Sequence, residues 1–556
     1  MSTEDLCSDI AKHFGDTVAG DDSLLKDCMS LCRTFNLSAE DLLYKWEAVN
    51  YKNQRSFRIF TPDSVSELRA HLHSEQAKAF ASRQGAVSRN FGIKGRGGFR
   101  GLLKNATIAP TKLDETTTLS QVIFRGPRMD ELSRKSRYYR YMYEQVLERS
   151  EVLDDRIDCF AELVQRHYRI DELGDPFCAT TEAVTVVGRI VLDAEAASSG
   201  IKINESSLVL ESSRMMGSGV RVPIRLTSET KLRGSIKGTT GLSFFPGAIV
   251  ALRGRNGGGG FFSVDEILAL PLFQTPSPPL SDPGASFSMY IACGPFTADS
   301  DLHYKPWSQL FQNLKSTKPA VVLLIGPFVD AEHPQIMAGD IGKTPSEIFE
   351  RHFQETLRDF LLQSPGSMVL LVPSVRDLIS DHVVFPQCEL KLFGTDSRIH
   401  CLPNPCRFSL NGVSFGVTSV DVLFHLRKEE YFKRLQEVDP SVSDLAPASD
   451  AMTNLARNLL QQRSFYPIFP VPLEMSHEVN LDVTHSEGLK LGTEDECAPD
   501  VLVLPSRLKQ FSKAVDNSIV INPSFVHKGF YAKLSYAGQA SGIPRDRVDV
   551  EISKIA

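Results

Sequence analysis

The sequence predicts a multidomain protein with a small helical domain at the N-terminus, a small closed β-barrel in the middle and an α/β layered domain at the C-terminus. Three observations support this prediction. Apolar residues recur at helical spacing in the first 78 residues, the period changes to two between about residues 182 and 267, and strand-like and helical segments alternate after residue 285. The length of 556 residues fits three or four domains.

The composition argues against a membrane protein and against a broad nucleic-acid-binding surface. Lys and Arg total 61 against 68 Asp and Glu, a net charge of −7, so any contact with a phosphate backbone must be local or supplied by a partner. No apolar run reaches the roughly 18 residues that span a bilayer, and the start of the chain lacks an apolar signal region. The ten cysteines show no CxxC spacing, which predicts reduced thiols in the cytosol or nucleus.

Residues 1–78 are expected to form a helical docking domain. A second helix should begin at Ser38, because its side chain can cap the free N–H groups of the turn that follows. The apolar positions of the two helices are Leu24, Leu25, Cys28, Leu31 and Cys32, and then Leu42, Leu43, Trp46 and Val49.

Residues 79–135 are predicted to be a flexible basic linker. Ser82–Lys104 contains six basic residues, six glycines and no acidic residue, so it cannot bury enough apolar surface to fold alone. The alternative is an arm that contacts nucleic acid through Arg96, Phe99 and Arg100.

Residues 136–170 are predicted to form a helix that leads into the barrel. A stripe at helical spacing is expected to pack on the next domain, as core stripes usually do. Its members are Tyr139, Met142, Tyr143 and Val146.

Residues 171–273 contain about five short strands with alternating polarity, separated by Gly, Ser and Asn turns. This density of strands is typical of a barrel of the oligonucleotide/oligosaccharide-binding (OB) type. Gly254–Phe262 should be a flexible hairpin loop, because its glycines do not match a phosphate-binding loop. Residues 274–284 are rich in proline and predict a hinge.

Residues 285–556 contain six apolar runs that each end in a small or polar cluster. In an α/β layered domain, chemistry is placed on the loops after such strands. The order of the strand ends resembles the calcineurin-like metallophosphoesterases, in which Asp, His and Asn ligands converge on two cations. The motif positions hold other residues here, namely Gly294, Pro295, Pro327, Ser374, Val375, Arg376, Asp377, Pro505 and Ser506.

The sequence therefore predicts a phosphoesterase fold without its metal ligands, with no catalytic residue and no cofactor. Asp330 and Asp377 remain as candidates for one weak cation, although a carboxylate without His neighbours is more often a cap or an ion-pair partner. Walker loops, Gly-x-Ser-x-Gly elbows and HExxH motifs are absent from the sequence.

A barrel of the OB type followed by an inactivated phosphoesterase domain resembles the B subunits of eukaryotic replicative DNA polymerases, and the helical N-terminus favours the polymerase alpha–primase branch. The segments that carry this resemblance are Asp154–Asp158, Ile291–Phe296, Leu324–Pro334, Val372–Asp377, Gln461–Pro470, Pro499–Phe511, Val520–Ser524 and Lys528–Leu534.

The resemblance implies a nuclear, non-catalytic scaffold subunit that supports initiation of DNA replication by RNA–DNA primer synthesis. It implies that the barrel and the inactive domain bind the zinc-bearing C-terminal domain of the polymerase catalytic subunit. Primase subunits would join through the complex, the N-terminal domain would recruit replication factors, and contact with DNA would be indirect or weak.

Two other functions stay open at this point. One is an active metal-dependent phosphodiesterase or nuclease with displaced ligands such as Asp330, Asp377 and Asp421. The other is a free single-stranded-DNA-binding protein that uses the barrel. Proline-directed phosphorylation is also a hypothesis for Thr61, Thr275 and Ser277.

Overall fold

The computed structural model divides the chain into two compact units, Met1–Asp114 and Glu115–Ala556. The described residues are 9–10, 12–14, 21–35, 37–52, 65, 68, 72, 122–127, 131–138, 143–192, 202–217, 219–274, 285–392, 396–440, 450–492, 497–538 and 544–555. In this part of the chain, no helix is both long enough and apolar enough to cross a membrane.

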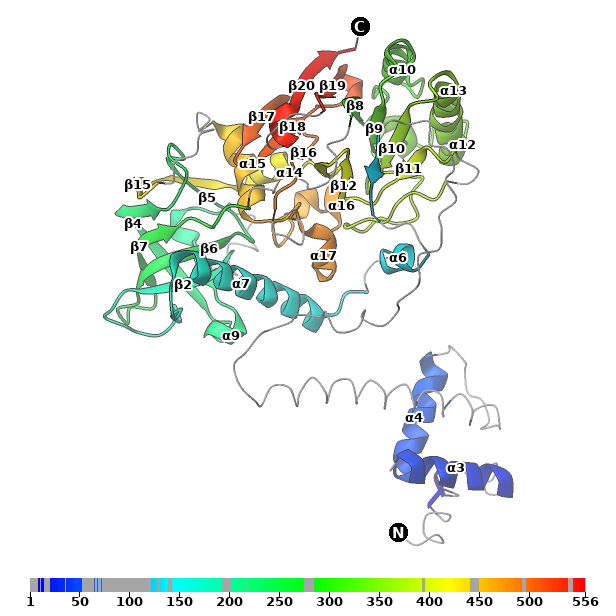
Figure 1. The fold of residues 1–556 in the computed structure, drawn as a ribbon. Coiled ribbons are helices and arrows are strands. Elements are labelled where there is room, and N and C mark those ends of the chain that lie inside the picture. Colours follow the sequence, from blue (N-terminus) through cyan, green and yellow to red (C-terminus); the bar gives the residue numbers. More distant parts are fainter. Residues whose placement is uncertain are drawn as a thin grey trace. The chain divides into compact units, whose positions relative to one another are not determined.

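The first unit contains the helices α3 (Asp22–Phe35) and α4 (Ala39–Lys52) (Figure 1). Ser38 caps α4 as predicted: its Oγ accepts the N–H of Asp41 at 3.1 Å, and its own N–H donates to the Asp41 carboxylate at 3.3 Å. Reciprocal bonds of this kind satisfy two N–H groups that the first helical turn leaves free. The predicted apolar faces meet in a core that includes Leu24, Cys28, Leu31, Cys32, Leu42 and Val49.

The segment before the barrel forms two helices, α6 (Glu131–Ser136) and α7 (Val146–Tyr168). The long helix therefore begins at Val146 and not at Ser136. The predicted stripe is wrong at its two described positions, because the side chains of Tyr143 and Val146 are 64% and 75% exposed. Tyr139 and Met142 lie outside the described residues. The buried face of α7 consists of Ile157, Phe160, Ala161 and Val164.

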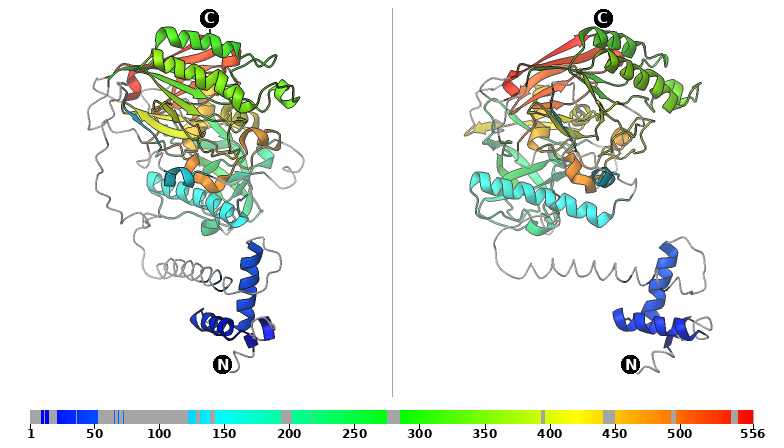
Figure 2. Two further views of the ribbon diagram at one scale, coloured as in Figure 1. Left: turned by 90° about the vertical axis from the view of Figure 1, so that its right-hand side faces the viewer. Right: turned by 45° about the vertical axis from the view of Figure 1, so that its right-hand side comes forward.

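The barrel is a closed ring of the five strands β2, β3, β4, β6 and β7, because β4 pairs with both β3 and β7. Its interior is filled by alternate side chains such as Val186, Leu210, Ile224 and Phe262. Helix α7 packs across the outside of β2 and β6 (Figure 2). The strands are β2 (Val184–Val191), β3 (Val209–Glu211), β4 (Arg221–Arg233), β6 (Ile249–Arg255) and β7 (Phe262–Leu268).

Two six-stranded sheets form the remainder of the second unit and pack on each other through a shared apolar core. The first has the order β11-β10-β9-β8-β19-β20, with β8 to β11 parallel. Its strands are β8 (Phe287–Cys293), β9 (Val321–Ile325), β10 (Met368–Val372), β11 (Ile399–Cys401), β19 (Phe530–Tyr536) and β20 (Val548–Lys554).

The second sheet has the order β1-β12-β13-β16-β18-β17. Its strands are β1 (Phe124–Arg125), β12 (Cys406–Leu410), β13 (Val413–Val417), β16 (Val501–Val503), β17 (Phe511–Val515) and β18 (Ser518–Asn522). All six predicted apolar runs of this region are strands, namely β8, β9, β10, β13, β16 and β18.

Helices cover the outer faces of the two sheets. The first sheet is covered by α10 (Lys305–Thr317), α12 (Pro345–Phe349) and α13 (Glu355–Gln363), and this layer buries Trp307, Phe353 and Phe360 against it. The second sheet is covered by α14 (Val422–Glu429) and α15 (Ala451–Gln461). These two helices share one apolar core with the second sheet and the interior of the barrel.

A ribbon from the two-sheet region pairs directly with the barrel region. Strand β14 (Tyr431–Arg434) is antiparallel to β5 (Gly241–Phe244), and β15 (Gln436–Val438) is parallel to β4. The Glu437 carboxylate accepts the N–H groups of Gly238 and Thr240 at 3.2 and 2.8 Å. The barrel and the two sheets are thus joined by backbone pairing as well as by apolar contacts.

Candidate functional site at the strand ends

The carboxyl ends of β8, β9 and β10 meet at one edge of the first sheet, because the three strands are parallel and adjacent. The loops after β13 and β16 reach the same place. Cys293 at the end of β8 is buried, which raises the pKa of its thiol, and it lies within the electrostatic influence of Asp421, Arg376 and Asp377. The motif positions that the sequence singled out for metal chemistry therefore lie on these converging loops. Arg96, Phe99 and Arg100, the candidate nucleic-acid contacts, lie outside the described residues.

The first two loops leave no room for a ligand side chain. A Cβ atom on Gly294 would lie 2.0 Å from the carbonyl oxygen of Pro327, and a Cβ on Gly326 would lie 2.2 Å from an oxygen of Asp377. Real Cβ contacts essentially never fall below 3.0 Å. The Pro327 backbone thus fills the space that a ligand side chain at Gly294 would need, and the Asp377 carboxylate packs directly against Gly326.

Asp377 is turned inward from the third loop. One carboxylate oxygen accepts the backbone N–H groups of Phe328 and Val329, the latter at 3.1 Å, and the other accepts the N–H of Ser374 at 2.8 Å. Burial nevertheless raises the pKa of Asp377 to about 7, against the opposing effect of these donors. The carboxylate therefore ties the loops of β9 and β10 together and has little capacity left for a cation.

Arg376 and the loop after β9 form the first charged group of the site. The Arg376 guanidinium holds the Asp330 carboxylate with two hydrogen bonds, one of them at 3.0 Å from Nε, and also lies 3.0 Å from Glu332. The Asp330 side chain is only 7% exposed. The two residues predicted for a weak cation, Asp330 and Asp377, are thus both near this edge, but each already has strong donors.

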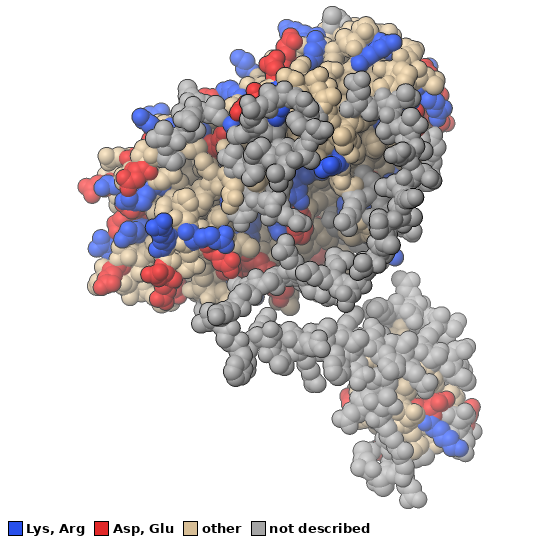
Figure 3. Space-filling view, viewed as in Figure 1, with Lys and Arg blue, Asp and Glu red and all other residues tan. Residues whose placement is uncertain are grey.

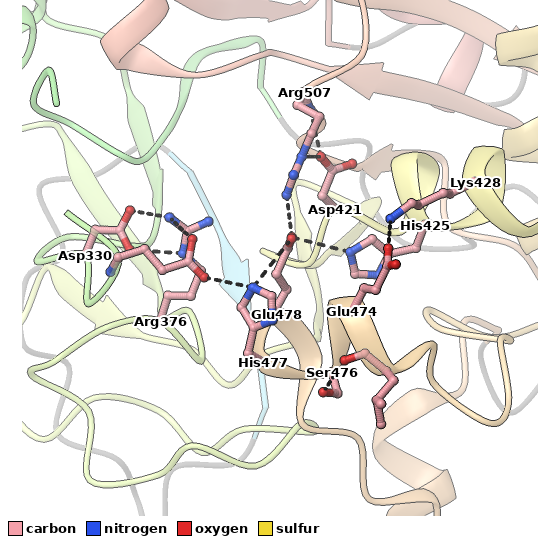
Figure 4. Close-up of polar contacts among 12 residues, drawn as sticks. Asp330, Arg376, Asp421, His425, Lys428, Glu474, Ser476, His477, Glu478 and Arg507 are labelled. Carbon is pink, nitrogen blue, oxygen red and sulfur yellow. Dashed lines mark hydrogen bonds and ion pairs between the residues drawn. The ribbon is translucent and has the colours of Figure 1, made fainter. Parts of the chain in front are cut away.

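Arg507 after β16 forms the second charged group (Figure 4). It donates to Asp421 through its backbone N–H at 2.8 Å and its Nε at 3.1 Å, and it also pairs with Glu478. Burial by itself would raise the pKa of Glu478, but the hydrogen bond with His425 and the charges of Arg507 and His425 lower it to about 2.

Histidines connect and support the two charged groups. His477 lies 3.3 Å from Glu332 and 4.0 Å from Glu478, so it bridges them. The buried His425 lies 3.4 Å from Glu478 through Nε2 and 3.0 Å from the Tyr466 hydroxyl through Nδ1. Two guanidinium groups thus pair with four carboxylates of this edge, Asp330, Glu332, Asp421 and Glu478, where a two-metal enzyme would place metal ions.

The other predicted positions are structural. Pro295 accepts the N–H of His527 through its carbonyl at 3.0 Å, and Val375 packs against the apolar core. Pro505 and Ser506 are buried, and the Ser506 N–H donates to Asn522 at 2.9 Å. Thr61, Thr275 and Ser277 lie outside the described residues.

Sequence reasoning missed Glu332, His477 and Glu478 as parts of this site. Glu478 comes from α16 (Ser476–Val479), a short helix without a recognisable motif, and its partner Arg507 is 29 residues away. Among the described residues, no group of three or more His, Cys, Asp and Glu side chains is arranged to hold a metal ion.

Comparisons with known proteins match both the barrel and most of the two-sheet region. A family model for the B subunit of DNA polymerase alpha/epsilon matches residues 289–513, and a model for the OB domain of the DNA polymerase alpha B subunit matches residues 150–270. The B subunit of DNA polymerase alpha from Schizosaccharomyces pombe is 37% identical over 417 residues, which cover 72% of this chain and 68% of the relative. The chain belongs to the family of DNA polymerase alpha B subunits.

Two further relatives carry the same name. The B subunit from Saccharomyces cerevisiae is 30% identical over 449 residues, which cover 71% of this chain, and that from Bos taurus is 30% identical over 394 residues, which cover 69%. The matched regions span only 60% and 58% of these two relatives. The match to a solved structure of TT1561 from Thermus thermophilus covers 49% of this chain and 100% of that chain, and its 10% identity and TM-score of 0.20 are too low to indicate a shared fold.

The family assignment confirms the resemblance drawn from the sequence and the OB character of the barrel. The matched OB domain contains all five strands of the closed ring. The match to the alpha/epsilon family covers the first three strand ends and Asp421, Glu478 and Arg507. The charged edge therefore lies within the part of the chain that defines this family.

Proposed function

We propose that this chain is a non-catalytic accessory subunit of DNA polymerase alpha, and that its two-sheet region is a calcineurin-like phosphoesterase fold that lacks its metal ligands. The observation that carries the proposal is the filled edge at the strand ends. Gly294 has no space for a ligand side chain, Gly326 packs against the Asp377 carboxylate, and Arg376 and Arg507 pair with the carboxylates around them. Arginine gives charge neutralisation without the open coordination position that hydrolysis needs.

The proposed partner is the C-terminal, zinc-bearing domain of the polymerase catalytic subunit. In support, the barrel and the two sheets form one compact unit that can offer a continuous surface, and obligate interfaces commonly bury about 2,000 Å² or more. Primase subunits would join through that complex in the nucleus, so that the chain supports RNA–DNA primer synthesis, and the N-terminal helical unit would dock other replication factors.

Native purification of the tagged full chain from nuclear extract tests this proposal. We expect a polymerase alpha catalytic subunit and two primase subunits to remain bound near one to one after washing at about 0.3 M salt, where surface charges are strongly screened. A chain that is recovered alone and monomeric would contradict the proposal.

A metal titration separates this function from that of a nuclease. Because the carboxylates of the edge already have donors, we expect about 1 mM Mn²⁺ to change the melting temperature by less than about 1 °C, since only a bound ligand stabilises the native state. Single-stranded DNA should stay uncut in the same buffer. A saturable rise in melting temperature together with Mn²⁺-dependent cleavage, both lost in Asp377→Ala, would establish the nuclease instead.

A further inference from the structure

The part of the barrel that α7 does not cover presents a cluster of basic side chains. In the pairing of β4, β7 and β6, Arg225 and Arg255 lie on either side of Ser263, and in the next row Lys231 and Arg253 lie on either side of Glu266. We call Arg225, Lys231, Arg253 and Arg255 the basic face. All four side chains are exposed, and Figure 3 shows basic side chains in a row over these strands.

Most of these cations have no carboxylate partner. Among the described residues, Arg225, Lys231 and Arg253 form no ion pair within 4.0 Å, and Arg255 has only a 3.4 Å contact with Asp265. The carboxylate between the rows, Glu266, is already held by Arg233 at 2.9 and 3.1 Å. Glu266, which also interacts electrostatically with Lys231 and Arg253, and Asp265 therefore offset only part of the positive charge of the basic face among the described residues.

Aromatic rings lie next to these cations. The Phe261 ring is half-buried and lies under the guanidinium of Arg225, whose Cζ is 3.7 Å from the ring centroid. Phe261 follows four exposed glycines, 257–260. Asn256 anchors this loop by donating from Nδ2 to the carbonyls of Pro176 and Phe177 at 3.0 and 3.1 Å. The Phe177 ring is 62% exposed.

We propose that the basic face, together with Phe261 and Phe177, binds single-stranded nucleic acid. Phosphates would lie across the rows of cations, and unpaired bases would stack on the rings beside the glycine loop. A duplex fits this site less well, because its bases are stacked inside and cannot reach the rings. This contact goes beyond the scaffold role, because it assigns a ligand to the outer surface of the barrel, and none of its residues belongs to the charged edge.

Fluorescence anisotropy with labelled 20-residue oligo-dT and oligo-rU tests the proposal on the full chain between 50 and 200 mM salt. For Arg225→Ala/Arg253→Ala we expect about tenfold or more weaker binding, and a slope of log Kd against log salt that is smaller by about 1.4, or 0.7 per lost phosphate contact. The matched control is Arg351→Ala/Arg358→Ala, which removes two exposed arginines from the helical layer over the first sheet and should leave binding unchanged.

A second variant separates stacking from charge. Phe261→Ala should weaken binding about tenfold with an unchanged salt slope, since base–aromatic stacking does not release counterions. Equal binding by wild type, Arg225→Ala/Arg253→Ala and the control would overturn the proposal and would assign any affinity to another part of the chain. Loss of polymerase co-purification without loss of oligonucleotide binding would identify the basic face as a protein interface instead.

Discussion

Arginines are concentrated in two regions of the second unit, and their surroundings differ. At the strand ends, Arg376 and Arg507 each hold carboxylates from other loops, and three of these acids, Asp330, Asp421 and Glu478, are largely buried. On the barrel, Arg225 and Arg253 point away from the strands and have no such partner among the described residues. The same side chain is thus an internal counter-ion in one region and an open binding group in the other, a distinction that the net charge of −7 conceals.

The largest effect should come from adding one methyl group at the filled edge. Gly294→Ala would place a Cβ 2.0 Å from a backbone oxygen that cannot move independently, so we expect a loss of about 4 kcal/mol or more in the free energy of unfolding. Gly257→Ala in the barrel loop is the matched control, because no atom lies within 4 Å of its added Cβ. Urea denaturation of both variants measures the difference, and similar stabilities would show that the edge has free space.

Asp377 should make stability depend on pH. Burial raises the pKa of this carboxyl to about 7, whereas an unfolded aspartate titrates near about 3.9. Between these values the unfolded chain releases a proton that the native state keeps. This contribution to stability is therefore complete below about pH 4 and declines by about 3 kcal/mol as the pH rises to 7.

Comparison with Asp377→Asn checks this sign, because the amide does not titrate. The stability of wild type relative to the variant should fall from pH 4 to 7. Glu478 serves as a control in which stability changes with pH in the opposite direction. Its pKa is lowered to about 2, so its contribution to the stability of the native state is lost only as the pH falls below about 4. A wild-type curve parallel to that of Asp377→Asn would mean that the three N–H donors keep Asp377 ionised.

The smallest predicted difference compares one arginine from each region. Arg376→Ala removes the guanidinium that pairs with Asp330 and Glu332, which should cost about 2 kcal/mol because Asp330 is mostly buried. Arg253→Ala removes an exposed charge without an ion-pair partner in the described part of the chain, so its cost should stay below about 0.5 kcal/mol. Equal costs in thermal denaturation would remove the distinction between the two regions.

Local signals in the sequence were sufficient for most of the fold. The cap at Ser38, the strands of the barrel and the six apolar runs each depend on neighbouring residues and their period. The start of α7 was misplaced because Tyr143 and Val146 match helical spacing, although their side chains face solvent. Periodicity reports which residues share a face but does not report what covers that face.

The candidate site was predicted by position but not by its contacts. The motif positions identified the strand ends, and the glycines and prolines there implied lost ligands. Arginines stand where metal ions would lie, and this depends on pairs such as Asp421 with Arg507, 86 residues apart, and Asp330 with Arg376, 46 residues apart. Pairs at such separations follow from the fold and leave no spacing pattern that could reveal them.

The pairing of β15 with β4 has a consequence for synthesis of the protein on the ribosome. The last barrel strand ends at Leu268, whereas β15 ends at Val438, 170 residues later. The part of β4 that pairs with β15, residues 231–233, lies beyond the part that pairs with β3. At about 5–20 residues per second, this edge of the nascent barrel stays uncovered for roughly 10–30 s. An exposed strand edge is a template for wrong pairing, so we expect chaperones to bind the growing chain during this interval. A fragment that stops at Leu268 would keep this edge of β4 unpaired permanently.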